Sequence, residues 1–93
     1  MKNDDPKAVA LRYQRGKDTA PRVTAKGRGV LAERILELAT EYGIPVQRDT
    51  ALIDALYRLE VNEEIPEDLY QVIAEILAFI YRMNRLKAAS GQI

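Results

Sequence analysis

Apolar and polar residues follow two different periods along the chain, and these periods predict the order of its elements. Residues 8–13 are apolar and then alternate, and residues 22–26 follow a proline, so each stretch predicts a strand. From residue 31 the apolar positions recur with a helical period. This helix should end at Gly43, because glycine suits a left-handed cap and Pro45 prevents continuation. The first half of the chain is therefore expected to form two strands and a helix.

The second half predicts one more strand and two more helices. Residues 44–47 suit a short strand, which would complete a right-handed strand–helix–strand crossover if it pairs in parallel with residues 22–26. Asp49 or Thr50 can cap the second helix. The last helix is expected over residues 66–88, about 35 Å long at 1.5 Å per residue, so it should cross the domain. The predicted fold is α/β, with a small mixed sheet of about three strands, three helices and a long C-terminal helix.

The last predicted helix carries more apolar surface than one core requires. Its apolar arc spans roughly 220°, against about 100° for an ordinary surface helix. One stripe should face the sheet and comprises Leu69, Val72, Ile73, Ile76, Ile80 and Met83. A second stripe beside it comprises Tyr70, Ala74, Leu77 and Tyr81. Either the second helix covers this second stripe, or part of the stripe stays exposed as a contact surface.

Length and composition indicate one folded domain. The 93 residues are 47% hydrophobic and 30% charged, which is typical of a globular domain with a single modest core. We expect a flexible tail over residues 1–6, a domain over residues 7–88 and a second tail over residues 89–93. No apolar run approaches the roughly 20 residues that a membrane-spanning helix needs.

Residues suited to catalysis are few. The chain contains neither cysteine nor histidine, which excludes thiol nucleophiles, thiolate metal sites and imidazole bases. Ser90 is the only serine, and the carboxylates of Glu60, Glu63 and Glu64 are expected to be solvated. Residues 27–29 (Gly-Arg-Gly) are too short for a dinucleotide-binding fingerprint and are interpreted as a turn. We therefore expect no enzymatic activity, no metal and no cofactor.

The net charge is zero, but the charges are unevenly distributed. Residues 1–34 contain nine Lys or Arg against four Asp or Glu, and the remainder contains five against ten. One functional hypothesis is a small nucleic-acid-binding domain that uses Arg12, Arg22, Lys26 and Arg28. Such domains usually carry an overall basic excess, which is missing here.

Six segments in order resemble the cytoplasmic domain of the FlhB family, which comprises export-switch proteins of the FlhB, YscU, SpaS and EscU types. Together they cover residues 7 to about 87. They are residues 8–13 (AVALRY), 20–27 (APRVTAKG), 44–46 (IPV), 55–57 (ALY), 65–70 (IPEDLY) and 72–82 (VIAEILAFIYR). Family members carry a membrane domain before this region. The resemblance therefore implies a stand-alone homologue of the half that remains after the family's self-cleavage.

The family's cleavage loop is Asn-Pro-Thr-His, in which the Asn side-chain amide attacks its own carbonyl. Here the corresponding residues are Asn3, Asp4, Asp5 and Pro6, so the Asn is retained while the following Pro, the Thr and the His are not. The strand that precedes the loop in the family is also missing. We therefore expect that the chain does not cleave itself.

The resemblance also implies a binding surface and its partners. In the family a small apolar patch is associated with the capture of export substrates, and its positions match Ala20, Pro21, Ala74 and Leu77. The expected partners are export-gate proteins and secreted substrates of a flagellar or other type III system, at the cytoplasmic side of the inner membrane. The N-terminal part of a full-length FlhB is a further candidate partner, because the missing strand would leave a sheet edge open.

Overall fold

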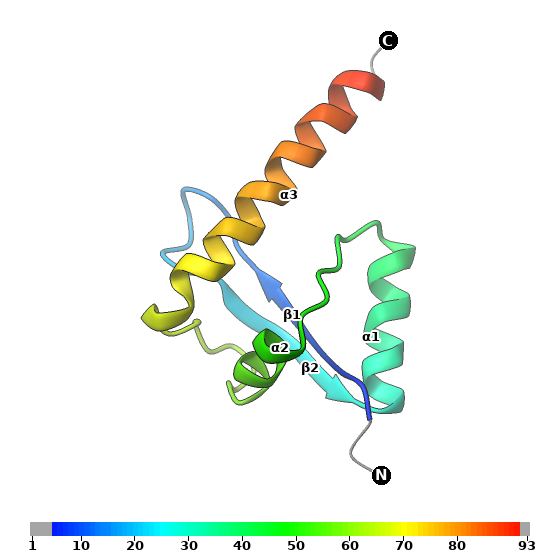
Figure 1. Cartoon of the computed structure of the whole chain (residues 1–93), viewed down its shortest axis with the longest axis vertical. Helices are drawn as coiled ribbons and strands as arrows, with labels where there is room; N and C mark the ends of the chain where they lie inside the picture. Colours follow the sequence, from blue (N-terminus) through cyan, green and yellow to red (C-terminus); the bar gives the residue numbers. More distant parts are fainter. Residues whose placement is uncertain (1–4, 92–93) are drawn as a thin grey trace.

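A computed structural model describes the backbone of residues 5–91 and the side chains through residue 83. The two strands are adjacent and antiparallel, and the helices surround them (Figure 1). In chain order the elements are β1 (Lys7–Arg12), β2 (Arg22–Arg28), α1 (Val30–Glu41), α2 (Thr50–Tyr57), the 3-10 turn η1 (Glu67–Leu69) and α3 (Tyr70–Gly91).

The hairpin has one face of small side chains and one face of larger ones. The register pairs Ala8 with Gly27 and Ala10 with Ala25, and it shifts between Ala10 and Leu11. Helix α1 packs against the face of small residues, where its Ala32 is fully buried. Because these residues are small, the helix can approach the strands closely.

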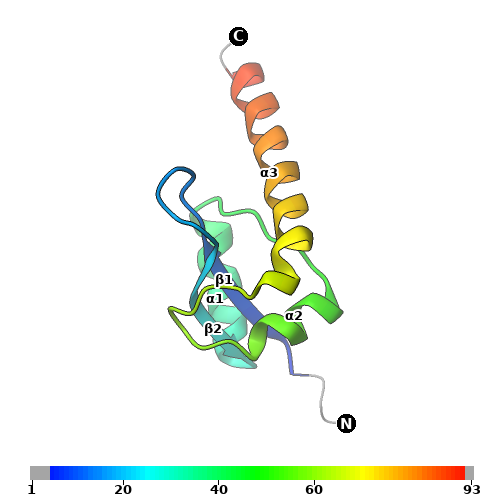
Figure 2. The same ribbon diagram turned by 90° about the vertical axis from the view of Figure 1, so that its left-hand side faces the viewer.

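Larger side chains on the opposite face of the hairpin form the core. Val23 is fully buried there. A buried cluster is formed by Leu56 of α2, Ile73 of α3, and Ile65 in the segment before α3. Val9 and Leu11 of β1 pack on this cluster. Burying one such side chain contributes about 1.5–3 kcal/mol. This cluster therefore fixes α2 and the start of α3 on the hairpin, across from α1 (Figure 2).

The predicted α/β class is confirmed, but the prediction of a third strand is wrong. Residues 44–47 are exposed and lie outside the sheet, which among the described residues has two strands. The N–H of Ile44 instead donates to the carbonyl of Ala39 at 2.8 Å and completes the end of α1. Pro45 has no N–H to offer a ladder. The strand–helix–strand crossover is therefore absent, and the chain runs from α1 directly to α2.

A segment before α3 supports the outer edge of β2. The backbone N–H of Asn62 donates a hydrogen bond to the carbonyl of Val23 at 2.7 Å, and the backbone N–H of Ile65 donates to the carbonyl of Pro21 at 2.9 Å. Arg22 forms an ion pair with Glu64, at 3.1 Å between Nη2 and Oε2. These contacts connect the start of β2 to the segment that leads into α3.

Helix α2 is capped by Asp49, one of the two predicted cap residues. The Asp49 carboxylate accepts a hydrogen bond from the Leu52 N–H at 3.0 Å. Two lysines of the hairpin also hold the helix. Lys7 forms an ion pair with Asp54, and Lys26 donates to the carbonyl of Tyr57. An exposed ion pair such as Lys7–Asp54 contributes at most about 1 kcal/mol to stability. The Asp49 cap and the buried Leu56 therefore contribute most to the position of α2.

Helix α3 extends beyond the rest of the molecule (Figure 1). It is preceded by the 3-10 turn at Glu67–Leu69 and continues to Gly91, three residues past the expected end. Along the stripe expected to face the sheet, Ile73 is buried, and Met83, which is 49% exposed, lies past the core. Within residues 5–91, no helix is long and apolar enough to cross a membrane.

Candidate functional site

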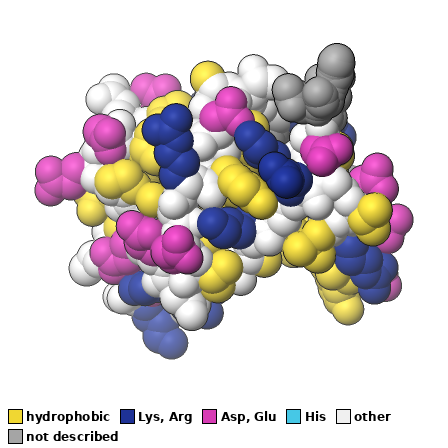
Figure 3. All heavy atoms as spheres, turned by 90° about the horizontal axis from the view of Figure 1, so that it is seen from below, with side chains coloured by type: hydrophobic (Ala, Val, Ile, Leu, Met, Phe, Trp, Pro, Cys, Tyr) yellow, Lys and Arg dark blue, Asp and Glu magenta, His cyan; other side chains and the backbone are white. Residues whose placement is uncertain are grey.

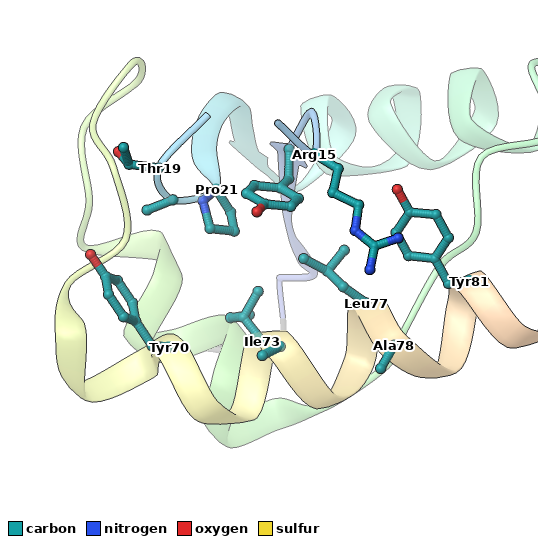
Figure 4. A pocket seen from close by; sticks show the side chains of 11 residues that line it. Arg15, Thr19, Pro21, Tyr70, Ile73, Leu77, Ala78 and Tyr81 are labelled. Carbon is teal, nitrogen blue, oxygen red and sulfur yellow. The ribbon is translucent and has the colours of Figure 1, made fainter. Parts of the chain in front are cut away.

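A hollow of about 290 Å³ lies between α3 and the connection that joins β1 to β2 (Figure 4). On the helix side its lining residues are Tyr70, Ile73, Ala74, Leu77, Ala78 and Tyr81. On the side of the connection they are Tyr13, Arg15, Thr19, Ala20 and Pro21. The lining therefore comes from two segments about 50 residues apart in sequence, which the fold brings together.

The helix wall of the hollow follows from the helical period. Tyr70, Ala74, Leu77 and Tyr81 recur at spacings of three or four residues and so share one side of α3. These four residues are the predicted second stripe, and all four line the hollow. Tyr70 and Tyr81 stay 42% and 43% exposed. The connection between the strands, and not α2, borders the stripe, so the stripe is only partly covered.

The opposite wall is a structured turn followed by a buried corner. The N–H groups of Lys17 and Asp18 donate to the carbonyl of Gln14, and the Asp18 carboxylate accepts from the Gln14 N–H at 2.7 Å. Gly16 supplies the positive φ of 84° that the turn requires. This turn gives Arg15 a defined position at the mouth of the hollow.

The four residues expected to form the patch meet in this hollow, with unequal exposure. Ala20 is 3% exposed and Pro21 is also buried, so they line the hollow without offering much surface. Ala74 is exposed and Leu77 is half-buried. Ala20 and Pro21 are therefore covered by their own chain. The accessible surface lies on α3.

The sequence reasoning missed five lining residues. Ile73 was assigned to the core stripe, and it is both buried in the core and part of the lining. The others are Tyr13, Arg15, Thr19 and Ala78. The Arg-Gly pair at positions 15–16 is typical of a turn, but no local pattern shows which surface a turn will face.

The chemistry of the lining suits noncovalent binding of apolar groups. Its apolar side chains are accompanied by three tyrosines, and no lining residue is a carboxylate. Arg15 is the one charged lining residue, and its guanidinium carbon lies 4.9 Å from the centre of the Tyr81 ring. In the described part of the chain, no group of three or more acidic, His or Cys side chains could hold a metal ion. An apolar hollow with polar groups at its border is a common form of binding site.

The basic residues of the nucleic-acid hypothesis do not form a separate site. Arg22 is paired with Glu64, and the Lys26 ammonium lies 5.0 Å from the centre of the Tyr57 ring while donating to that residue's carbonyl. Seen from below, basic and acidic side chains alternate on the surface with apolar ones between them (Figure 3). This mixture gives no support to a basic face for nucleic acid.

The degenerate cleavage-loop positions lie only partly within the described structure. Asn3 and Asp4 fall outside the described residues. Asp5 and Pro6 are exposed, and the Pro6 carbonyl accepts a hydrogen bond from the Gly29 N–H at 2.8 Å. The start of β1 is thus held beside the start of α1.

Comparison with solved structures defines the class. The fold superimposes on the PscU C-terminal domain with a TM-score of 0.75 at 41% sequence identity, over 80% of this chain and 95% of that one. It matches the cytoplasmic domain of FlhB from Shewanella putrefaciens with a TM-score of 0.83 at 32% identity, over 89% of this chain and 65% of that one. The architecture is therefore that of the C-terminal domains of type III export proteins.

Sequence comparison identifies the family. Residues 3–80 match the model of the FlhB HrpN YscU SpaS family, and the chain belongs to this family of flagellar and type III export-switch proteins. It is 45% identical to the uncharacterized protein YlqH of Bacillus subtilis, over 90% of this chain and 92% of YlqH. It is 42% identical to the flagellar biosynthetic protein FlhB of Salmonella typhimurium, over 91% of this chain but only 22% of that protein.

Proposed function

We propose that the hollow beside α3 binds an apolar segment of another polypeptide within a flagellar or related type III export apparatus. The observation that carries this proposal is the convergence of Ala20, Pro21, Ala74 and Leu77, predicted as a patch from distant parts of the sequence, in one apolar hollow. The side of α3 at this hollow remains open to solvent at Tyr70, Ala74 and Tyr81.

The proposed partners are secreted substrates and proteins of the export gate. Family membership supports them, because the relatives include flagellar biosynthetic FlhB proteins. The proposed location is the cytoplasmic side of the export apparatus at the inner membrane, by analogy with the FlhB cytoplasmic domain that this fold resembles. The hollow is apolar and would bury only a short segment, so we expect weak, reversible binding suited to sampling many substrates.

A pull-down against export-gate proteins and hook-type substrates tests this function. Leu77→Asp places a charge in the hollow, but Leu77 also packs on the core cluster, so a loss of binding could reflect a loss of folding. Ala74→Asp is sharper, because Ala74 is exposed and its substitution should leave the core intact. An unpaired charge against an apolar ligand should weaken binding at least about tenfold.

Phe79→Asp provides the matched control on the same helix. Phe79 is 52% exposed and does not line the hollow. The proposal expects Ala74→Asp to lose the partner while Phe79→Asp retains it, with both variants giving the circular dichroism spectrum of the parent. Equal retention by the two variants would refute a binding role for the hollow.

The open edge of β1 supports a second proposed contact. Within residues 5–91, β1 pairs with β2 alone, and the apolar side chains of Ile44 and Val46 lie exposed outside the sheet. A strand from the N-terminal part of a full-length FlhB could add to this edge through main-chain hydrogen bonds. Hydrogen exchange tests the contact. Mixing the two polypeptides should slow exchange in β1 and at residues 44–47, and unchanged exchange in both segments would contradict it.

A further inference from the structure

The mouth of the hollow carries a charged side chain, Arg15, that makes no side-chain hydrogen bond with any side chain described through residue 83. Arg15 forms no ion pair with any described carboxylate, although Arg22 and Lys7 each do. Its guanidinium carbon lies 4.9 Å from the centre of the Tyr81 ring, at one end of the hollow (Figure 4). A guanidinium has five N–H donors in a planar fork, and a contact with one aromatic ring leaves donors that can bind a carboxylate.

The charges around the hollow are arranged unequally at its two ends. The turn that holds Arg15 also carries the exposed side chain of Lys17, and the exposed Arg12 precedes it at the end of β1. The Asp18 carboxylate of the turn already accepts from a backbone N–H. At the Tyr70 end, the residues just before α3 are acidic at Glu67 and Asp68. A ligand with a negatively charged group is therefore attracted to the Arg15 end of the hollow and not to the Tyr70 end.

The spacing along α3 sets where the negative group should lie. Tyr81 is one helical turn beyond Leu77, a rise of about 6 Å at 1.5 Å per residue. In an extended peptide, residues i and i+2 point to the same side and lie about 6.6 Å apart. An apolar side chain against Leu77 would thus place the side chain two residues away beside Arg15.

We propose that the hollow selects an extended segment in which an aliphatic residue is separated by one residue from an aspartate or glutamate, whose carboxylate binds Arg15. This inference rests on the proposed function of the hollow and adds the chemistry of its ligand. Ala74 and Leu77 contact the aliphatic side chain, and Arg15 on Tyr81 provides the polar contact that fixes the register.

Three blocked heptapeptides test the proposal against the whole chain. The first has the sequence Ser-Val-Ala-Leu-Ser-Asp-Ser, the second carries Asn in place of Asp, and the third carries Lys. Binding is followed by NMR through the methyl signals of Ala74 and Leu77. We expect the Asp peptide to bind about fivefold more tightly than the Asn peptide, the size of a partly exposed charge-assisted contact, and the Lys peptide to bind most weakly.

Variants of the turn isolate the role of Arg15. Arg15→Gln should remove the preference for Asp over Asn, while Lys17→Gln, in the same turn but outside the lining, should keep most of it. Arg15→Lys should retain part of the preference, because it keeps the charge but loses the planar fork. Added salt should reduce the preference in the parent protein.

The outcomes separate this inference from the proposed function. Equal binding of the Asp and Asn peptides would overturn the role of Arg15 and leave the apolar hollow as a binding site. A preference for Asp that survives Arg15→Gln would also overturn that role. If none of the three peptides shifts the methyl signals at millimolar concentration, both the ligand chemistry and the proposed function of the hollow are contradicted.

Discussion

At the scale of single residues, Gly27 of β2 lies so close to α1 that a larger residue would not fit without a shift. A Cβ at this position would lie 2.5 Å from Cγ and 2.9 Å from Cβ of Leu31 in α1. These are the inner atoms of the leucine side chain, so rotation of its tip cannot relieve the overlap. The glycine that the sequence indicated only as part of a turn therefore sets the distance between α1 and the hairpin.

Gly27→Ala should lower the free energy of unfolding by about 1–3 kcal/mol, the usual cost of overpacking. Urea denaturation followed by circular dichroism measures the change. Leu31 is 55% exposed, so Leu31→Ala alone should cost little. In the double variant the two effects should not add, because removing the leucine removes the clash. Additive losses would show that the close approach is not the cause.

The residue that follows Asn3 determines whether the peptide bond between residues 3 and 4 is expected to be cleaved. In the family's loop a proline after the asparagine blocks attack by the backbone N–H and favours attack by the side-chain amide. Asp4 replaces that proline here, and the chain has no histidine at all.

We therefore predict that the purified protein stays intact during days of incubation at neutral pH. Intact-mass spectrometry should show the uncleaved chain and no fragments. Restoring the family tetrapeptide with Asp4→Pro, Asp5→Thr and Pro6→His provides a comparison under the same conditions. A fragment beginning at Asp4 in the unmodified protein would refute the prediction.

At the scale of elements, local signals predicted the helices well and the third strand poorly. The Asp49 cap, Gly43 and the apolar periods of α1 and α3 act within a few residues, so they can be read from the sequence. Residues 44–47 have strand-like composition, but a strand also has to pair with a neighbour, and in the described residues this segment pairs with neither strand of the sheet. Partners in a sheet are chosen by the whole fold, which a local pattern does not contain.

Asp49→Ala should destabilise the protein by about 1 kcal/mol, because the Leu52 N–H would lose its partner at the start of α2. Asp49→Asn keeps a side-chain oxygen at the cap and should retain most of the stability. Thermal denaturation of the three proteins in parallel gives the comparison. If the alanine and asparagine variants melted together, the cap would have no measurable role.

At the scale of the whole molecule, α3 joins the core at its beginning and leaves it farther along. Ile73 is 3% exposed within the core cluster, while Phe79 of the same helix is 52% exposed. The second stripe of α3 could be predicted from the helical period. The other wall of the hollow could not, because the placement of Arg15 and Tyr13 depends on how the connection between the strands folds over a helix about 60 residues away.

Ile73→Ala should therefore cost about 2–4 kcal/mol, as for other large-to-small changes in a core. Phe79→Ala should change the stability by less than about 1 kcal/mol, because its side chain is largely solvated. Urea titration of both variants tests this division of α3. Similar losses at the two positions would mean that the exposed part of the helix contributes to the core.

The most direct test of the account is site-specific photocrosslinking at the hollow. Benzoylphenylalanine is placed at position 74 or, as the control, at position 79 of the purified protein, which is then mixed with a hook-type export substrate and irradiated. The account predicts a covalent adduct from position 74, mapped by mass spectrometry to an apolar segment of the substrate, and little or none from position 79. Adducts of equal yield from the two positions, or an adduct from position 79 alone, would contradict it.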